Sequence, residues 1–277
     1  MKKIVFLNGK FIPQKAAKLP VLTPGFLYGW GLFETMRAYN NRIVYLEAHL
    51  ERMKRSARLL NIRCLYSLVK FKEIIYEIVK INALRDAYVR LTLWKTEIGT
   101  DTLIIAKKYH PYSSQKYKKG FRACISSFRQ NEDSFLAQFK TTNYLLYRLA
   151  YTQAIEKGFD EAIILNRKGY IAQTSRSNLF FIKDKELFTP SLESRCLNGI
   201  TRRVIFDLAR KYNIKAYAGE FTILDLYASD EAFLTNSLLG IMPLASVEKC
   251  QIGKGRSPYK LTRFFMEKYK SLLGNGP

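Results

Sequence analysis

Histidine and cysteine are scarce in this 277-residue chain, which has two histidines and four cysteines. His49 and His110 are too few for a multi-histidine metal site. No cysteine has a CxxC partner or a neighbouring histidine, so the spacing of zinc ligands is missing. The sequence therefore predicts no metal site and four reduced thiols, and it leaves little scope for Ser-His-Asp hydrolase chemistry.

Long apolar runs are missing as well. Runs such as 162–165 are far shorter than the roughly 18 apolar residues that can cross a bilayer. Near the N-terminus, Asn8, Gly9 and Pro13 interrupt any stretch that could form the core of a signal peptide. We expect no membrane partner and a cytoplasmic protein.

Acidic residues are few, with 23 Asp and Glu against 46 Lys and Arg, a net charge of +23. Since 48% of the chain is hydrophobic and 14% aromatic, it has enough apolar material to fold. The charge raises the possibility of a nucleic-acid-binding or non-catalytic protein. Because the basic residues are dispersed and no nucleic-acid module is recognisable, we expect no nucleic acid as a partner.

The hydrophobic pattern predicts strands interleaved with helices, without a strict βαβ rhythm. This order favours the α+β class over a doubly wound sheet. The strands are expected at 4–7, 33–39, 88–94, 102–106, 121–127, 161–166, 170–172, 178–182 and 231–235, and the helices at 46–60, 68–79, 143–157 and 200–212. Residues 167–169 are expected to form a hairpin turn.

The domain boundary is predicted in a stretch of Pro, Ser, Gly and Lys with little periodicity. We expect a small N-terminal lobe over 1–110, an exposed interdomain linker over 111–120 and a larger lobe over 121–277.

The start of the helix predicted over 200–212 has the features of an anion site. Asn198 is a candidate cap, Gly199 allows close approach of a ligand, and the N–H groups of Ile200 and Thr201 would lie at the positive end of the helix dipole. An ordinary capped helix is the alternative, because such helix starts are common.

Lys140 stands just before the helix predicted over 143–157, where its charge opposes the dipole. Either the side chain points into water or its amine is needed in a neutral, nucleophilic state. The alternative is one more surface lysine.

Several ordered motifs extend over nearly the whole chain, from about residue 6 to residue 269. With these motifs the chain resembles the fold-type IV pyridoxal-phosphate enzymes, two-lobed proteins that include branched-chain and D-amino-acid aminotransferases and 4-amino-4-deoxychorismate lyase. The matching stretches are Phe26-Leu27-Tyr28-Gly29, Phe33-Glu34-Thr35, His49-Leu50-Glu51-Arg52, Ser56-Ala57, Lys140-Thr141-Thr142-Asn143-Tyr144, Gly158-Phe159-Asp160-Glu161-Ala162, Ser177-Asn178-Leu179-Phe180, Gly199-Ile200-Thr201-Arg202 and Thr235-Asn236-Ser237.

The resemblance implies that Lys140 is the catalytic residue, which binds pyridoxal 5'-phosphate covalently and shuttles the proton at the substrate α-carbon. The larger lobe would then be the cofactor-binding lobe. The other cofactor-binding residues that it implies are Arg52, Tyr144, Gln173, Ile200, Thr201, Asn236 and Ser237. The backbone of Ile200 and Thr201 would hold the phosphate, with side chains of Arg52 and Ser237 as partners. For Tyr144, placed at the cofactor's phenolic oxygen, the alternative is core packing.

Gln173 departs from the family pattern, which has a glutamate at this position. A glutamate holds the pyridine nitrogen protonated, whereas a neutral amide supplies no counter-charge and leaves the ring a poorer electron sink. This substitution fits a slow or divergent enzyme, or a cofactor-binding protein that has lost its chemistry.

Five residues resemble the substrate pocket of the family: Tyr28, Phe33, Arg37, Tyr88 and Arg90. Tyr88 and Arg90 are two residues apart and so share one face of a strand, where an arginine could grip a carboxylate. As alternatives, Phe33 and Tyr88 belong to the core and Arg90 forms a buried ion pair.

The stretch 235–243 looks like the Asn-containing loop of aminodeoxychorismate lyases. We therefore expect a lyase of folate biosynthesis that releases pyruvate and 4-aminobenzoate. The alternative is an aminotransferase acting on branched-chain or D-amino acids with a 2-oxo acid acceptor. The family resemblance also implies a small anionic amino-acid-like substrate and a homodimer.

Overall fold

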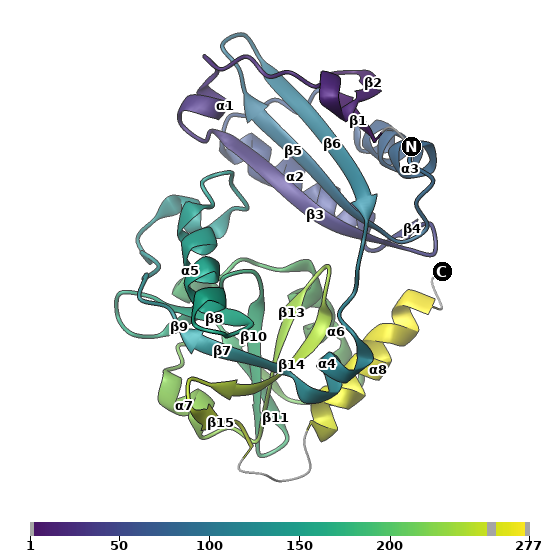
Figure 1. Cartoon of the computed structure of the whole chain (residues 1–277). Coiled ribbons are helices and arrows are strands. Elements are labelled where there is room, and N and C mark those ends of the chain that lie inside the picture. Colours follow the sequence, from purple (N-terminus) through teal and green to yellow (C-terminus); the bar gives the residue numbers. More distant parts are fainter. Residues whose placement is uncertain (1–2, 254–258, 275–277) are drawn as a thin grey trace. The chain divides into compact units, whose positions relative to one another are not determined.

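The computed structural model describes residues 3–253 and 259–274 (Figure 1). The chain divides into two compact units, Met1–His110 with Phe139–Asn143 and Pro111–Gln138 with Tyr144–Pro277. The segment Phe139–Asn143, which we had assigned to the larger lobe, thus packs within the first unit. Residues 1–2, 254–258 and 275–277 of the predicted lobes lie outside the described residues.

The first unit is built on one antiparallel sheet with the strand order β2-β1-β6-β5-β3-β4. Its elements are β1 (Ile4–Leu7), β2 (Lys10–Pro13), α1 (Pro24–Leu27), β3 (Gly31–Tyr39), β4 (Arg42–Ile43), α2 (Leu46–Leu59), α3 (Leu68–Ile81), β5 (Ala87–Lys95) and β6 (Thr100–Lys108). The four strands and two helices expected here are all present.

Alternation along β5 explains how this unit forms its core. Val89, Leu91 and Leu93 are fully buried and join one hydrophobic core with residues of α2 and α3. Both helices cover the same face of the sheet in Figure 1. The alternate residues of β5, including Tyr88 and Arg90, therefore point to the opposite face of the sheet.

The second unit contains a mixed nine-stranded sheet, with the order β12-β11-β10-β13-β14-β7-β8-β9 and β15 paired to β14. Its elements are α4 (Ser114–Lys119), β7 (Phe121–Ile125), α5 (Leu145–Glu156), β8 (Glu161–Leu165), β9 (Ile171–Thr174), β10 (Asn178–Lys183), β11 (Glu186–Pro190), α6 (Ile200–Lys211), β12 (Ala216–Gly219), α7 (Ile223–Tyr227), β13 (Glu231–Asn236), β14 (Gly240–Val247), β15 (Cys250–Gln251) and α8 (Lys260–Gly274). Strand β9 also lies against β10 and β11, so the sheet curls.

The α+β class is confirmed by this mixture of elements. The expected turn at 167–169 joins the antiparallel strands β8 and β9. The stretch 111–120, expected to be an exposed linker, contains α4, which packs against β14. No helix among the described residues is long and apolar enough to span a membrane.

Candidate functional site

Lys140 is held by pairing with the start of β3, not by the helix that follows it. The Phe33 N–H donates to the Lys140 carbonyl oxygen (2.9 Å), and the Thr142 N–H donates to the Gly31 carbonyl (2.9 Å). Helix α5 begins only at Leu145. The expectation that a helix start controls the protonation of Lys140 is therefore wrong. The groups that do so belong to the first unit.

Lys140 is half-buried, and its amine lies beside cations and an aromatic ring. Its Nζ lies 4.5 Å from the centroid of the Phe33 ring, and the guanidinium carbon of Arg90 lies 3.7 Å from the same centroid. Burial and then the charge of Arg52 lower the pKa of Lys140 to about 8, against the opposing pull of Glu34. Lys140 therefore differs from an ordinary surface lysine in being half-buried against the Phe33 ring.

Arg52 is clamped by a buried carboxylate. Its Nε and Nη2 donate to Oε1 and Oε2 of Glu34, both at 2.7 Å, and His49 Nδ1 lies 2.7 Å from the same Oε2. All three side chains are buried. Burial alone would raise the pKa of Glu34, but Arg52 and His49 lower it to about 2. Glu34 is therefore a carboxylate at neutral pH.

His49 donates to this carboxylate as a neutral ring. Burial lowers the pKa of His49 and outweighs the attraction of Glu34. Sequence reasoning gave Glu34 and His49 no role. The sequence nevertheless contains a signal for them. Glu34 and His49 are polar residues at positions where the apolar patterns of β3 and α2 predict burial.

Four of the five predicted substrate residues share one face of the first sheet. Arg37 pairs with Tyr88 across β3 and β5, and Phe33 and Arg90 lie on the same side of those strands. Arg90 Nε donates to Thr92 Oγ1 (3.3 Å), so its partners are a hydroxyl and the Phe33 ring and not the ion pair considered as an alternative.

Tyr28, the fifth predicted substrate residue, is not on the sheet. It is the C-cap of α1, where 72% of the residue is exposed.

In the second unit, helix α6 starts without a side-chain cap. Gly199 is the N-cap residue, so the prediction that Asn198 caps the helix is wrong. A Cβ on Gly199 would clash with Asn178 Oδ1, and Asn178 Nδ2 donates to the Leu197 carbonyl (2.8 Å). Glycine is required here because Asn178 approaches the turn so closely.

The first turn of α6 carries groups that suit a phosphate. Ile200 and Thr201 are 3% and 2% exposed. Arg202 is also buried, and although its Nη2 donates to the Pro190 carbonyl (3.0 Å), its Nε has no hydrogen-bond partner. A helix N-terminus with a buried guanidinium that has an unused donor fits an anion.

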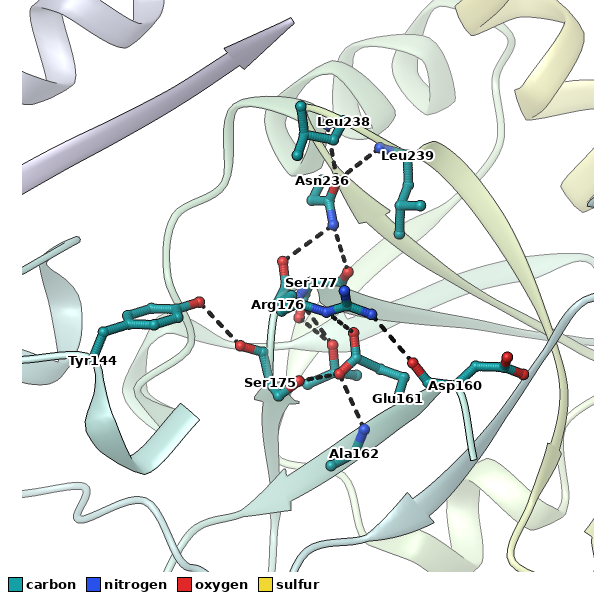
Figure 2. Close-up of polar contacts among 11 residues, drawn as sticks. Tyr144, Asp160, Glu161, Ala162, Ser175, Arg176, Ser177, Asn236, Leu238 and Leu239 are labelled. Carbon is teal, nitrogen blue, oxygen red and sulfur yellow. Dashed lines mark hydrogen bonds and ion pairs between the residues drawn. The ribbon is translucent and has the colours of Figure 1, made fainter. Parts of the chain in front are cut away.

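Tyr144 and Asn236 contact the backbone of the second unit in Figure 2. The Tyr144 hydroxyl donates to the Ser175 carbonyl (3.0 Å). Asn236 Oδ1 accepts from the N–H groups of Leu238 (2.9 Å) and Leu239 (2.8 Å), which holds the turn that contains Ser237. The cofactor contacts of these residues stay predictions.

Gln173 is buried, and its carbonyl oxygen is engaged. Oε1 accepts from the Leu197 N–H (3.0 Å), and the NH₂ group, the donor of the amide, has Tyr147 as a hydrogen-bond partner. Nearby, Tyr147 donates to Gln130 Oε1 (2.6 Å). Burial raises the pKa of Tyr147 to about 12, with the hydrogen bond to Gln173 acting in the opposite direction.

Comparisons with known proteins give one consistent family. The model of the family described as amino-transferase class IV matches residues 31–247. A putative branched-chain-amino-acid aminotransferase of Methanocaldococcus jannaschii is 32% identical over 97% of this chain and 96% of its own, and an aminodeoxychorismate lyase of Bacillus subtilis is 28% identical over 98% and 96%. A branched-chain amino acid aminotransferase of T.th., solved with pyridoxamine 5'-phosphate, superimposes with a TM-score of 0.92 at 28% identity over 100% of this chain and 96% of that one.

Proposed function

The chain belongs to the class IV amino-transferase family, and from this premise we propose that it transfers the amino group between branched-chain amino acids and a 2-oxo acid. It is a fold-type IV enzyme that depends on pyridoxal phosphate. The proposal takes the alternative to the lyase reaction that the loop at 235–243 predicts. The names of the relatives support the aminotransferase better, since branched-chain aminotransferases outnumber the lyase among them.

The Lys140 amine, which lies over the Phe33 ring and has a lowered pKa, is the observation that carries this proposal. At pH 7.5, a group with a pKa of about 8 is neutral about a quarter of the time, against about one part in a thousand for an ordinary lysine. A neutral amine can take the proton from the substrate α-carbon and return it. When bound, pyridoxal phosphate supplies an electron sink for the charge that develops at that carbon.

Each unit, taken by itself, carries groups that suit a part of the cofactor. In the first unit, Lys140 offers the amine, and Arg52 supplies a cation that Glu34 holds in place. In the second unit, the uncapped start of α6 at Ile200 and Thr201 offers N–H groups suited to a phosphate, and the Nε of Arg202 is an unused buried donor.

The substrate face of the first sheet suits an amino acid with an apolar side chain. Arg37 and Arg90 supply guanidinium groups for a carboxylate, and Tyr88 supplies aromatic surface for an apolar side chain. Phe33 is buried, as the core alternative predicted, and its ring lies against the Arg90 guanidinium. We infer that this face selects a substrate with one charged and one apolar end.

The amide of Gln173 would slow the proton steps, because it gives the pyridine nitrogen a donor without a negative charge. A Gln173→Glu variant should bring the cofactor nitrogen into its protonated form and raise the rate of the first half-reaction. Steady-state absorbance and single-turnover rates measure the two effects. An unchanged or lower rate would show that the site has adapted to the amide.

A substrate panel tests the proposed function. Purified protein loaded with pyridoxal phosphate is given leucine, isoleucine or valine with 2-oxoglutarate, and, in parallel, D-amino acids or aminodeoxychorismate. We expect glutamate formation with the branched-chain amino acids and its loss in Lys140→Ala. Release of pyruvate from aminodeoxychorismate without amino transfer would establish the lyase instead, the second candidate that the Bacillus subtilis relative supports.

A further inference from the structure

The Glu34 carboxylate joins the helix α2 to the environment of the Lys140 amine. Both of its oxygens accept hydrogen bonds from α2, from Arg52 at Oε1 and Oε2 and from His49 at Oε2. Glu34 precedes His49 by 15 residues and Arg52 by 18, and the three side chains are buried together. The carboxylate is therefore fixed in orientation by two residues of one helix, of which only Arg52 has a proposed cofactor contact.

We propose that His49 is a positioning residue: by donating its Nδ1–H to Glu34, it keeps that carboxylate bound to Arg52 and thereby keeps the Lys140 amine available in its neutral form. The inference rests on the proposed function, in which Lys140 does the chemistry. His49 would act only through Glu34 and Arg52.

The charges around Lys140 give the physical basis. Glu34 attracts a proton to the amine, whereas Arg52 and Arg90 repel it, and these are the charged groups from β3, α2 and β5 that act on Lys140. Neutral His49 adds no charge but compensates Glu34 Oε2 with a short hydrogen bond. Without that bond, the carboxylate keeps more of its charge to attract the Lys140 proton.

Opposite shifts at Lys140 therefore distinguish this role from simple packing. Loss of the Nδ1–H donor should make the amine harder to deprotonate, whereas loss of the Glu34 charge should make it easier. A purely structural histidine would destabilise the fold without moving the titration of Lys140 in either direction.

The test compares His49→Asn with His49→Gln. The amide NH₂ of asparagine stands near the position of Nδ1, whereas that of glutamine stands near Nε2, so the two variants are similar in polarity but only one keeps the donor to Glu34. The full-length chain is prepared free of cofactor and labelled with trace acetic anhydride across pH, and mass spectrometry follows the acetylation of Lys140. Only the neutral amine reacts, so the midpoint reports its titration.

We expect a midpoint near pH 8 for the wild type and for His49→Asn. For His49→Gln the midpoint should rise by about one unit, and for Glu34→Gln it should fall by a similar amount. At pH 7 the uptake of pyridoxal phosphate, followed by absorbance, should be about tenfold slower in His49→Gln than in His49→Asn, since the neutral fraction falls by that factor. Glu161→Gln, which removes a buried carboxylate of the second unit, is the matched control and should leave the midpoint unchanged.

Equal midpoints in the two His49 variants would overturn the proposal, as would shifts of the same sign in His49→Gln and Glu34→Gln. If His49→Gln does not fold, Glu34→Gln against Glu161→Gln still decides, because an unchanged midpoint in Glu34→Gln removes the electrostatic link. The labelling needs no bound cofactor. If Lys140 of the wild type titrates as expected but the chain takes up no pyridoxal phosphate, the proposed function is wrong. The inference about His49 would then still hold.

Discussion

Two buried glutamates, one in each unit, have pKa values that are shifted in opposite directions. Glu34 on β3 is 1% exposed and Glu161 on β8 is 0% exposed. Yet the pKa of Glu34 is lowered to about 2, whereas burial raises the pKa of Glu161 above its usual value. Depth of burial cannot explain the difference, so it must come from the partners.

Each glutamate has one arginine partner, but the geometry of the contact differs. Glu34 has a two-pronged contact with Arg52, both bonds at 2.7 Å, and a third bond from His49. Glu161 has a single contact from Arg176 Nε, at 3.4 Å, beside hydrogen bonds from the Ser175 hydroxyl and the Ala162 N–H (3.0 Å). In Figure 2, Arg176 also turns toward the Asp160 carbonyl, to which its Nη2 donates (3.2 Å).

This difference shows where the molecule maintains a buried charge. A bidentate arginine repays the cost of burying a carboxylate, whereas one long contact from a partly exposed arginine does not. The charged cluster of the first unit lies beside the Lys140 amine, on which it acts. The Glu161 cluster joins β8 to the turn that carries Ser175 and Arg176, and there the glutamate serves mainly as a hydrogen-bond acceptor.

The largest expected effect is on stability when each glutamate becomes glutamine. Glu34→Gln leaves Arg52 buried without its carboxylate, and the free energy of unfolding at pH 7 should fall by about 3 to 5 kcal/mol. Glu161→Gln keeps an oxygen for Ser175 and Ala162 and loses only a weak ion pair, because the Arg176 side chain is 31% exposed. Its loss should be about 1 kcal/mol or less.

Urea unfolding of both variants beside the wild type measures this contrast. Equal losses would mean that burial and packing, and not the bidentate arginine, decide what a buried glutamate contributes. Circular dichroism of the folded variants is the control for a change of structure.

The dependence of stability on pH should differ in sign between the two sites. The folded pKa of Glu34, about 2, lies below the ordinary 4.5, so its contribution of about 3 kcal/mol is present above pH 4.5 and is lost as the pH falls from about 4.5 to about 2. The folded pKa of Glu161 lies above 4.5, so its contribution is greatest at low pH and declines as the pH rises past 4.5.

Stability differences between wild type and each variant isolate these contributions from the rest of the titration. The difference for Glu34→Gln should shrink as the solution is acidified below pH 4.5, and the difference for Glu161→Gln should grow in favour of the wild type. Parallel curves would contradict the opposite shifts of the two carboxyl groups.

Local pattern was sufficient for much of the fold. Alternation marked β5 and the face that carries Tyr88 and Arg90, and the spacing of apolar residues marked α2. Strand β14 was not predicted, because Gly240 and Pro243 make its sequence resemble a loop. In the structure, Pro243 pairs in register with Phe233 of β13, a long-range pairing that local sequence does not encode.

The sequence predicted residues of the candidate site but not the cause of the lowered pKa of Lys140. The resemblance pointed to Lys140 and Arg52, yet the local explanation, a lysine at a helix start, was wrong. The low pKa of Lys140 arises from burial beside α2, β3 and β5, whose residues lie about 50 to 100 positions earlier in the chain. Glu34 and His49 were recognisable only as polar residues at apolar positions, and their partners required the fold.

The smallest expected effect concerns the hydroxyl that supports Glu161. Ser175→Ala removes the donor from a buried carboxyl group, and the free energy of unfolding should fall by about 1 to 2 kcal/mol at pH 7. If the bond is assisted by charge, the same substitution should cost about 1 kcal/mol less in a Glu161→Gln background, where the acceptor is neutral. A double-mutant cycle by urea unfolding measures the difference. Equal costs in both backgrounds would mean that Glu161 acts as a neutral acceptor already in the wild type, which would widen its contrast with Glu34.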